Sequence, residues 1–527
     1  DAQYTYTSTF DWQRGGDALR EVAGENINRV QNSSNHNLTA SLTMQKFYDL
    51  IGLKKSKGKK PTASRTDKAG NKVKPKGNGF GNTIKNVLTM VKRVNLDYSE
   101  ISGKGLPGYT RSIGFLGTAK PSWGFVFGSQ SDVRFEAAKR GWLTTFNEFN
   151  EQYTQETRKR LNITAVAEPI KNLTIDIVAE RNISERYQES FRVNDLGAGE
   201  YEYENLLGNN SGSFDISTMM ISTAFSKSDE FNSENFDAFK ENRITIANRL
   251  AAQNGNGGGV DPDGFPVRYG KTSQDVLLPA FVAAYTGQDA GKVKLGALRT
   301  FPIPNWSIKY TGLMRNKWFK KKFKRFSLSH GYKAAYSINS FQTNLERENT
   351  LINAETQDFL PENIMANVVL TDRFNPLVKV DFEMKNSTSV SAEVSTERVL
   401  TMSFDNNLMT ELNRKDYTLG LGYRFKDVKF VTNIGGQKQR FKGDLNLKLD
   451  ATLKDNITII RNLELENNQI TAGQNVFSLK FGADYALSQA LNVKFFYDHS
   501  FSKFAVSTAF PQTTINTGFT LVYNFGN

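Results

Sequence analysis

The sequence predicts an all-β protein, a transmembrane antiparallel β-barrel segment with small helical insertions. Three observations indicate this class. Apolar and polar residues alternate over many stretches, which is the two-residue period of a strand. Aromatic residues gather at the ends of these stretches, and the polar positions carry Lys, Asp, Glu, Arg and Asn, as girdles and a wet interior require. Residues 173–193 and 324–344 each form a stretch longer than the usual globular strand of about 5–6 residues.

The last strand is the clearest one. On one of its sides lie Phe519, Leu521, Tyr523 and Phe525, while Thr520, Val522 and Asn524 fall on the other. A final strand of this kind is typical of outer-membrane barrels, in which the insertion machinery reads it. We therefore predict that these four apolar residues form an assembly-signal strand. Packing of the same side chains against lipid is the alternative, and both roles can coexist.

The same alternation recurs upstream, and it predicts a set of lipid-facing side chains. These are Tyr417, Leu419, Leu421, Tyr423, Leu445, Leu447, Leu449, Leu491, Val493 and Phe495. A soluble β-sandwich alternates in the same way with its apolar side inward. Alternation alone therefore leaves open which face is wet, and the aromatic ends and long strands favour the membrane.

Composition agrees with a barrel. The 527 residues include no cysteine, so no disulfide framework or thiol chemistry is expected. The longest apolar runs fall short of the ~18 residues of a transmembrane helix. The mean hydropathy of −0.49 suits a barrel because only alternate residues meet lipid. No signal peptide opens at Asp1, so we expect either a processed chain or the C-terminal piece of a longer one.

Residues 1–226 are predicted to be barrel strands with two special regions. Residues 54–76 form a loop with ten Lys or Arg and one acid, and residues 103–150 form a Gly- and aromatic-rich loop region. Short helices are expected at 44–53 and 82–92. A hairpin is expected around 161–179, with its turn at 169–172 on the periplasmic side. Residues 194–211 are expected to be a longer connection at the cell surface.

Residues 227–303 are predicted to be a helical insertion, either plug-like within the lumen or periplasmic. A helix is expected near 235–253, then a Gly/Asn linker at 254–259 and an apolar segment at 276–285. An insertion of this length exceeds a plain turn. From residue 304 to 527 the chain reads as strands and turns, ending on the aromatic strand. The total is about fourteen strands.

The residues show no recognisable catalytic, cofactor or metal motif, and we predict that the protein is not an enzyme. His36, His330 and His499 are scattered without metal-ligand spacing. Asp261 to Gly264 could begin a calcium loop, but the other ligand positions do not follow, which favours a plain turn. The net charge of +13 would suit nucleic acid. Basic and aromatic segments such as 315–325 better suit anionic lipid and lipopolysaccharide, so no nucleic-acid partner is expected.

Four stretches carry a family resemblance. They are residues 35–48 (NHNLTASLTMQKFY), 128–144 (GSQSDVRFEAAKRGWLT), 326–332 (FSLSHGY) and 417–427 (YTLGLGYRFKD). Together they resemble the C-terminal region of the SprA (Sov) family, the outer-membrane translocon of the type IX secretion system of Bacteroidetes. The resemblance runs from about residue 26 to the end as a whole pattern, and no single motif carries it.

The resemblance implies a single-chain, 36-stranded barrel in the cell outer membrane. It implies that folded cargo proteins with C-terminal sorting domains pass through to the surface, and that gliding motility depends on this where it occurs. The implied partners are a PorV-like barrel protein and a periplasmic plug protein. This chain departs from the family in lacking most of the strands, so the remaining N-terminal part of the same translocon is a further expected partner.

Three alternatives remain open from the sequence. The main one is a smaller complete outer-membrane channel of about fourteen strands for small-molecule or lipid uptake, with residues 227–300 as its internal plug. The others are an enzyme barrel with catalytic residues at its rim and an adhesin-like structural β-protein. A convergence of acidic and His side chains would indicate the enzyme, and solubility without detergent would indicate the adhesin.

Overall fold

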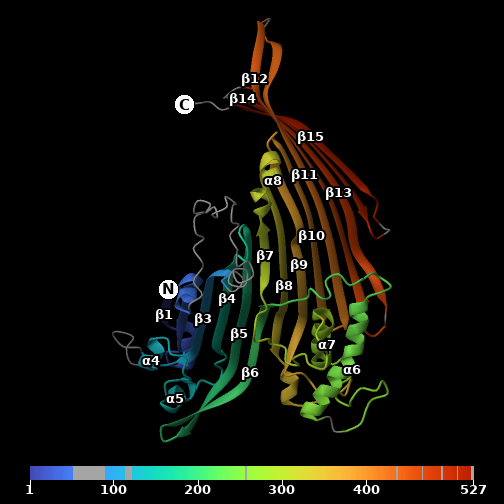
Figure 1. Cartoon of the computed structure of the whole chain (residues 1–527). Helices are drawn as coiled ribbons and strands as arrows, with labels where there is room; N and C mark the ends of the chain where they lie inside the picture. Colours follow the sequence, from blue (N-terminus) through green and yellow to red (C-terminus); the bar gives the residue numbers. More distant parts are fainter. Residues whose placement is uncertain are drawn as a thin grey trace, which may run out of the picture.

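The structure is a computed structural model that describes residues 1–51, 89–112, 121–255, 258–434, 437–465, 467–487, 491–506 and 509–523 (Figure 1). The basic loop 54–76, most of the helix expected at 82–92, part of the linker 254–259 and the signal residue Phe525 lie outside these ranges. Within them the prediction of an all-β antiparallel protein with few helices is confirmed.

Fifteen strands of the described chain form one antiparallel sheet. They are β1 (Ala2–Gln13), β2 (Asn28–Thr43), β3 (Val91–Tyr109), β4 (Tyr153–Ala167), β5 (Leu173–Gly197), β6 (Glu200–Ser217), β7 (Asn305–Tyr310), β8 (Phe323–Thr343), β9 (Asn363–Met384), β10 (Thr388–Ser403), β11 (Leu408–Ile434), β12 (Gln437–Asn462), β13 (Asn468–Ala486), β14 (Leu491–Phe504) and β15 (Gln512–Tyr523).

The helices lie in the connections between strands. They are α1 (Asp17–Ala23), α2 (Met44–Leu50), α4 (Trp123–Val126), α5 (Arg134–Lys139), α6 (Glu234–Asn254), α7 (Gln274–Thr286), α8 (Lys317–Lys322) and the 3₁₀ turns η1 (Gly312–Arg315) and η2 (Leu345–Glu348). The helices expected at 44–53 and 235–253 are confirmed as α2 and α6. No helix among the described residues combines the length and the apolar character needed to cross a membrane.

Strand order follows the chain except at one position, which β6 and β7 share. Residues 181–197 of β5 pair with β6, and residues 173–178 of β5 pair with β7. On their other side, β6 and β7 each pair with β8. Residues 218–304, which we call the insertion, leave the sheet at the end of β6 and return at β7. The insertion therefore interrupts one strand position rather than joining two complete strands.

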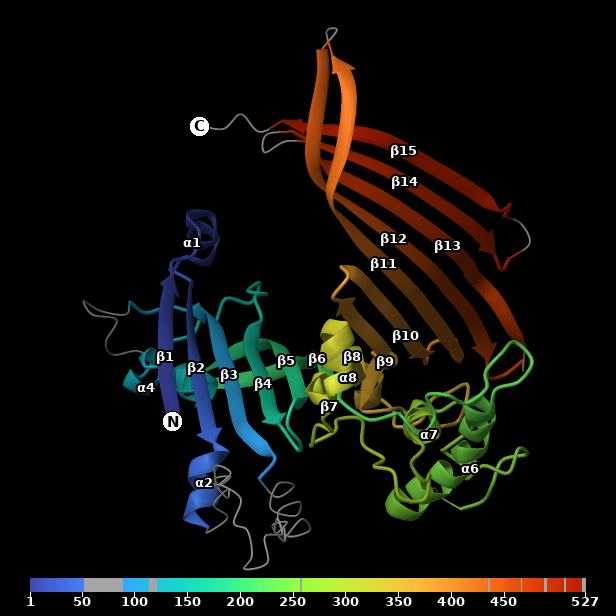
Figure 2. The same cartoon turned by 45° about the horizontal axis from the view of Figure 1, so that its top comes forward.

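The sheet is curved and open (Figure 2). Among the described residues, β1 pairs with β2 alone and β15 pairs with β14 alone. Two edge strands therefore present unpaired backbone groups. Curvature follows from the right-handed twist that accumulates over many long strands.

The two ends of the strands differ. At the turn end lie the β4–β5 turn (168–172), the β9–β10 turn (385–387), the connection 44–90 between β2 and β3 with α2, and also α8 and the last residue of β15. At the cap end lie the insertion and residues 121–150, which we call the small cap (Figure 1). From Val428 to Ile434, β11 pairs with β12 alone, so this hairpin projects past its neighbours at the turn end.

The expectation for residues 194–211 is wrong. Instead of a longer connection they form the paired ends of β5 and β6, joined by a turn at Ala198 and Gly199 with φ of 55° and 81°. The Gly and Asn letters suggested a loop, but Phe191, Val193 and Tyr203 of this hairpin pack into a buried cluster under the small cap. Tertiary packing thus overrode the local turn signal.

Buried residues concentrate at the cap end in two clusters. The larger one packs α6 and α7 against β8, β9, β10 and β11, with Phe239, Phe281 and Tyr336 at its centre. The smaller one packs the small cap against β2 to β6. Toward the turn end the sheet forms a single layer, and many large apolar side chains there are exposed, Leu419, Phe519 and Leu521 among them.

Candidate functional site

The strand register assembles an apolar face, which we call the belt. Residues directly opposite each other on paired strands share a face. One row on the C-terminal half runs through Phe382, Val390, Leu421, Leu449, Phe481 and Tyr497. On the N-terminal half a matching row runs through Tyr4, Leu38, Tyr98 and Leu161. In each half the alternation read from single segments therefore continues across neighbouring strands, and the N-terminal row ends at Arg181, which lies opposite Leu161.

The described residues of both predicted sets lie on this belt. Tyr423 and Leu421 lie opposite Leu447 and Leu449, and Leu445 lies opposite Tyr485. Leu491, Val493 and Phe495 lie opposite Tyr523, Leu521 and Phe519. Tyr417 and Leu419 lie opposite Val394 and Ala392. Phe519 is 76% exposed and Leu521 is 70% exposed, so the face is unpartnered at this edge.

The other face of the sheet carries charges of both signs. Lys379 Nζ lies 2.8 Å from Glu393 Oε2, and Arg325 Nη1 lies 3.0 Å from Asp381 Oδ1. Arg373 pairs with Glu397 across β9 and β10. An open cavity of about 380 Å³ on this face is lined by these and similar groups, Arg373, Glu393, Glu397, Arg414, Asp416 and Lys454. Opposite charges are interspersed, so the polar face is hydrated without a strong field of one sign.

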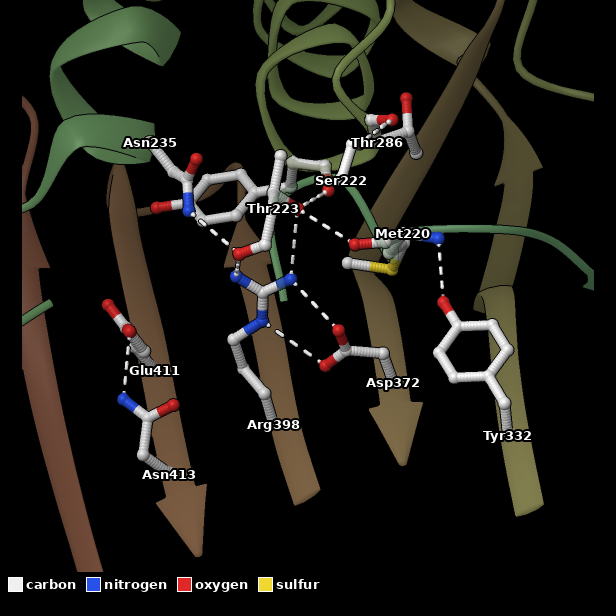
Figure 3. A network of polar contacts seen from close by, with 11 residues as sticks. Met220, Ser222, Thr223, Asn235, Thr286, Tyr332, Asp372, Arg398, Glu411 and Asn413 are labelled. Carbon is white, nitrogen blue, oxygen red and sulfur yellow. Dashed lines mark hydrogen bonds and ion pairs between the residues drawn. The ribbon is translucent and has the colours of Figure 1, made fainter. Parts of the chain in front are cut away.

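The insertion is attached to the belt side of the sheet by a buried arginine, Arg398 (Figure 3). Arg398 shares its face of β10 with Val390, Ala392 and Val394, because β10 and β11 keep one register from Thr388 to Ser403. Its Nη1 donates to the Thr223 carbonyl at 2.8 Å, and its Nη2 donates to Thr223 Oγ1 at 3.1 Å. Its Nη2 also lies 3.0 Å from Asp372 Oδ2, and both side chains are buried.

A second buried arginine repeats the arrangement. Arg461 Nε donates to Glu411 Oε2 at 3.0 Å, and the two side chains are 0% and 1% exposed. Arg461 Nη2 donates to Ser228 Oγ and to the Asp229 carbonyl, both at 2.9 Å. We call the pairs Arg398 with Asp372 and Arg461 with Glu411 the two clamps. Glu411 shares its face of β11 with Leu419, so the second clamp is also on the belt side. A plug would instead pack on the charged face.

The small cap covers the same side of the sheet. Asn32 lies on the same face of β2 as Leu38, and its Nδ2 donates to the carbonyls of Phe125 and Ser129, both at 2.9 Å. Arg134 Nη1 lies 2.7 Å from Glu189 Oε2, and its guanidinium carbon lies 4.4 Å from the centre of the Tyr153 ring. The insertion and the small cap therefore both cover the belt face at the cap end, where the strands extend beyond the exposed part of the belt.

Sequence reasoning missed these clamp residues. Arg398, Asp372, Glu411 and Arg461 are charged, and charged strand positions were read as the wet face. One signal could have found them, because Arg398 sits at even spacing between Val394 and Leu400 and so interrupts an otherwise apolar face. A charge in such a position is either solvated or paired in a buried site.

The three histidines lie on different strands, β2, β8 and β14. Tyr4 Oη and His36 Nδ1 are 2.6 Å apart, and His330 Nδ1 is 2.7 Å from the Leu377 carbonyl. Asp261 Oδ1 accepts from the Phe265 N–H at 2.8 Å within a turn. In the ranges that the structure describes, no group of three His, Cys, Asp or Glu could hold a metal ion.

The insertion is expected to lose stability as pH rises, through Asp275 of α7. Burial raises the pKa of Asp275, Arg347 opposes the rise and Glu362 adds to it. A folded-state pKa above the unfolded value means that the folded insertion holds the proton more tightly, so stability falls as pH rises from the unfolded to the folded pKa. We expect Asp275→Asn to raise the hydrogen-exchange protection of α7 at neutral pH and to remove this dependence.

The control for this measurement is Asp263→Asn, which changes an exposed carboxylate of the same insertion that pairs with Lys271. It should leave the pH dependence of α7 protection unchanged. An unaltered pH dependence in the Asp275→Asn protein would contradict the assignment.

No protein-family model and no curated protein matches the chain. Among solved structures, the RagAB peptide transporter has a TM-score of 0.26 and 8% identity over 98% of this chain and 49% of that one. The ferric-catecholate import receptor Fiu of E. coli K12 in its open form gives 0.21 and 7%, over 99% and 58%. The FrpB iron transporter of Neisseria meningitidis gives 0.22 and 8%, over 95% and 62%. The chain thus spans about half to three fifths of these proteins, and similarity this low establishes no shared function.

Proposed function

We propose that this chain forms part of the wall of a β-barrel in the cell outer membrane, through which cargo crosses. The observation that carries the proposal is the two-faced sheet, with the belt on one side and the charged face on the other. In a membrane barrel the strands place apolar residues toward lipid and polar residues toward a wet lumen. The belt would then meet lipid and the charged face would line the passage.

The connections suggest an orientation. Barrels of this kind keep short turns in the periplasm and longer segments at the cell surface. Most connections at the turn end are short, with the connection 44–90 as the long exception, so the turn end would face the periplasm and the insertion and small cap would lie at the surface. Both caps are on the outer side of the wall, beyond the bilayer, which differs from the plug-like or periplasmic position expected for residues 227–303.

The unpaired edges support a wall that is larger than this sheet. Within a bilayer no water satisfies the exposed N–H and C=O groups of an edge strand, so a spanning sheet must close. We therefore propose that further strands complete it between β15 and β1. This fits the resemblance to the SprA family, in which the remaining N-terminal part of the translocon would supply those strands.

We propose, in line with that resemblance, a protein-conducting role in type IX secretion. The charged face has opposite charges interspersed and open cavities. It would therefore stay hydrated beside a folded cargo protein and would bind that protein only weakly. Cargo with C-terminal sorting domains, a PorV-like barrel protein and a periplasmic plug protein would be the partners. The proposal includes no catalytic step, and the direction of transport would come from capture of cargo outside.

Cysteine cross-linking tests whether the sheet closes on itself. The sequence has no cysteine, so pairs can be introduced without background. In detergent, Thr7→Cys combined with Thr514→Cys, Asn516→Cys or Gly518→Cys samples several registers between β1 and β15. We expect no cross-link within one chain, because these edges are unpaired.

The positive control is Thr7→Cys with Asn35→Cys, which are opposite each other on β1 and β2 and should cross-link upon oxidation. A cross-link between β1 and β15 in a monomer would instead establish the smaller complete channel and remove the translocon proposal.

A further inference from the structure

Helix α8 lies at the turn end, between β7 and β8, in a strongly basic segment. Residues 315–325 contain seven Lys or Arg and no acid. Lys324 and Arg325 pair with Glu383. The other five cations are all exposed, and none has an ion pair within the described part of the chain: Arg315, Lys317, Lys320, Lys321 and Lys322.

An aromatic cluster connects α8 to the belt. Successive ring centres lie 5.1 Å apart from Trp318 to Phe319, 5.5 Å from Phe319 to Phe323, and 5.4 Å from Phe323 to Phe326. Phe326 stacks on Phe382 at 5.7 Å, and Phe382 lies opposite Val390 on the belt. Trp318, at the far end of the cluster, is 57% exposed. At the turn end the belt thus ends in this aromatic cluster, which we call the girdle, with the cations of α8 beside it.

The helix is held in a fixed place. Asn316 Oδ1 accepts from the Trp318 N–H at 2.8 Å, and the Lys385 N–H of the β9–β10 turn donates to the Lys322 carbonyl at 3.0 Å. These hydrogen bonds therefore fix the position of α8 and of the cations that it carries. Exposed Trp at the end of a lipid-facing surface, with Lys alongside, is the arrangement that interfacial anchors use, because the ring lies at headgroup level and the charges reach phosphate.

We infer that α8 binds the phosphate groups of anionic phospholipids in the leaflet at the turn end and fixes the height of the sheet in the bilayer. This rests on the proposed function, since it needs the belt to lie in lipid. The observations favour lipid over an acidic protein because the cations adjoin an aromatic cluster that continues the belt. Their attraction to anionic headgroups adds to the burial of the rings.

The test uses the full chain in vesicles of phosphatidylcholine with about one-fifth phosphatidylglycerol. Bromine atoms, which quench tryptophan, are carried either by the phosphatidylglycerol alone or by an equal amount of the phosphatidylcholine. The signal of Trp318 is the difference between the parent protein and Trp318→Phe. At low salt we expect brominated phosphatidylglycerol to quench Trp318 about twofold more strongly, and high salt should remove this preference.

Two matched variants separate local from overall charge. Replacing Lys317, Lys320, Lys321 and Lys322 by Gln should abolish the preference while quenching by both lipids persists. The second variant replaces four lysines of the insertion by Gln: Lys227, Lys240, Lys271 and Lys292. It removes the same charge at the cap end and should leave the preference for brominated phosphatidylglycerol intact.

The outcomes distinguish the two proposals. Equal quenching of Trp318 by both lipids in the parent protein, or loss of the preference in the cap-end variant, would overturn the anchor. If neither brominated lipid quenches Trp318, the girdle does not meet a bilayer, and both the anchor and the proposed function would be wrong.

Discussion

Replacing Arg398 with alanine is expected to release the insertion from the sheet while the strands remain paired. The change leaves the Asp372 carboxylate buried without its cation and removes both bonds to Thr223. Breaking a buried ion pair by removing one partner costs about 3–5 kcal/mol. The measurement is hydrogen exchange of α6 and α7, which should lose protection, while exchange in β9 and β10 changes little.

The chain supplies a matched control on the same two strands. Arg373 pairs with Glu397 on the charged face, where Arg373 is 45% exposed. Exposed pairs contribute about 0–1 kcal/mol, so Arg373→Ala should leave the insertion protected. A double variant, Arg398→Met with Asp372→Leu, removes both charges together and should restore only part of the protection, because the unpaired carboxylate is gone while both bonds to Thr223 stay lost. Equal loss in the Arg398 and Arg373 variants would refute the clamp.

Replacing Leu419 with arginine is expected to destabilise the protein strongly in a lipid bilayer. Leu419 lies within the belt on β11, opposite Ala392 and Ala451. An arginine on the lipid face of a membrane barrel costs about 2–4 kcal/mol near the bilayer midplane. Denaturant unfolding in vesicles, followed by tryptophan fluorescence, measures this loss of free energy.

Thr418→Arg is the matched control, since it adds the same side chain one residue away. Thr418 faces the charged side, opposite Glu393 and Thr452, where a new arginine would be hydrated. Its effect should stay within about 0.5 kcal/mol, as for an ordinary surface change. If both variants unfold alike, the belt does not face lipid, and the proposed membrane wall would have to be abandoned.

The sequence by itself determined which residues share a face of the sheet. Strand alternation is a local property with a period of two, so Tyr417, Leu419 and Leu421 could be grouped from one segment, and the register then placed Leu447 and Leu449 beside them. Helix α6 was also readable, because a 21-residue helix is encoded by its own residues. These features need no knowledge of distant parts of the chain.

Only the tertiary structure decided which side of the sheet the insertion covers and whether the edges pair. Arg398 meets Thr223 across 175 positions of sequence, and Arg461 meets Ser228 across 233. A charged strand residue looks the same in sequence whether water or a distant backbone carbonyl surrounds it. The partner is chosen by how the whole sheet curves and where the chain returns, and strand periodicity carries no information about either.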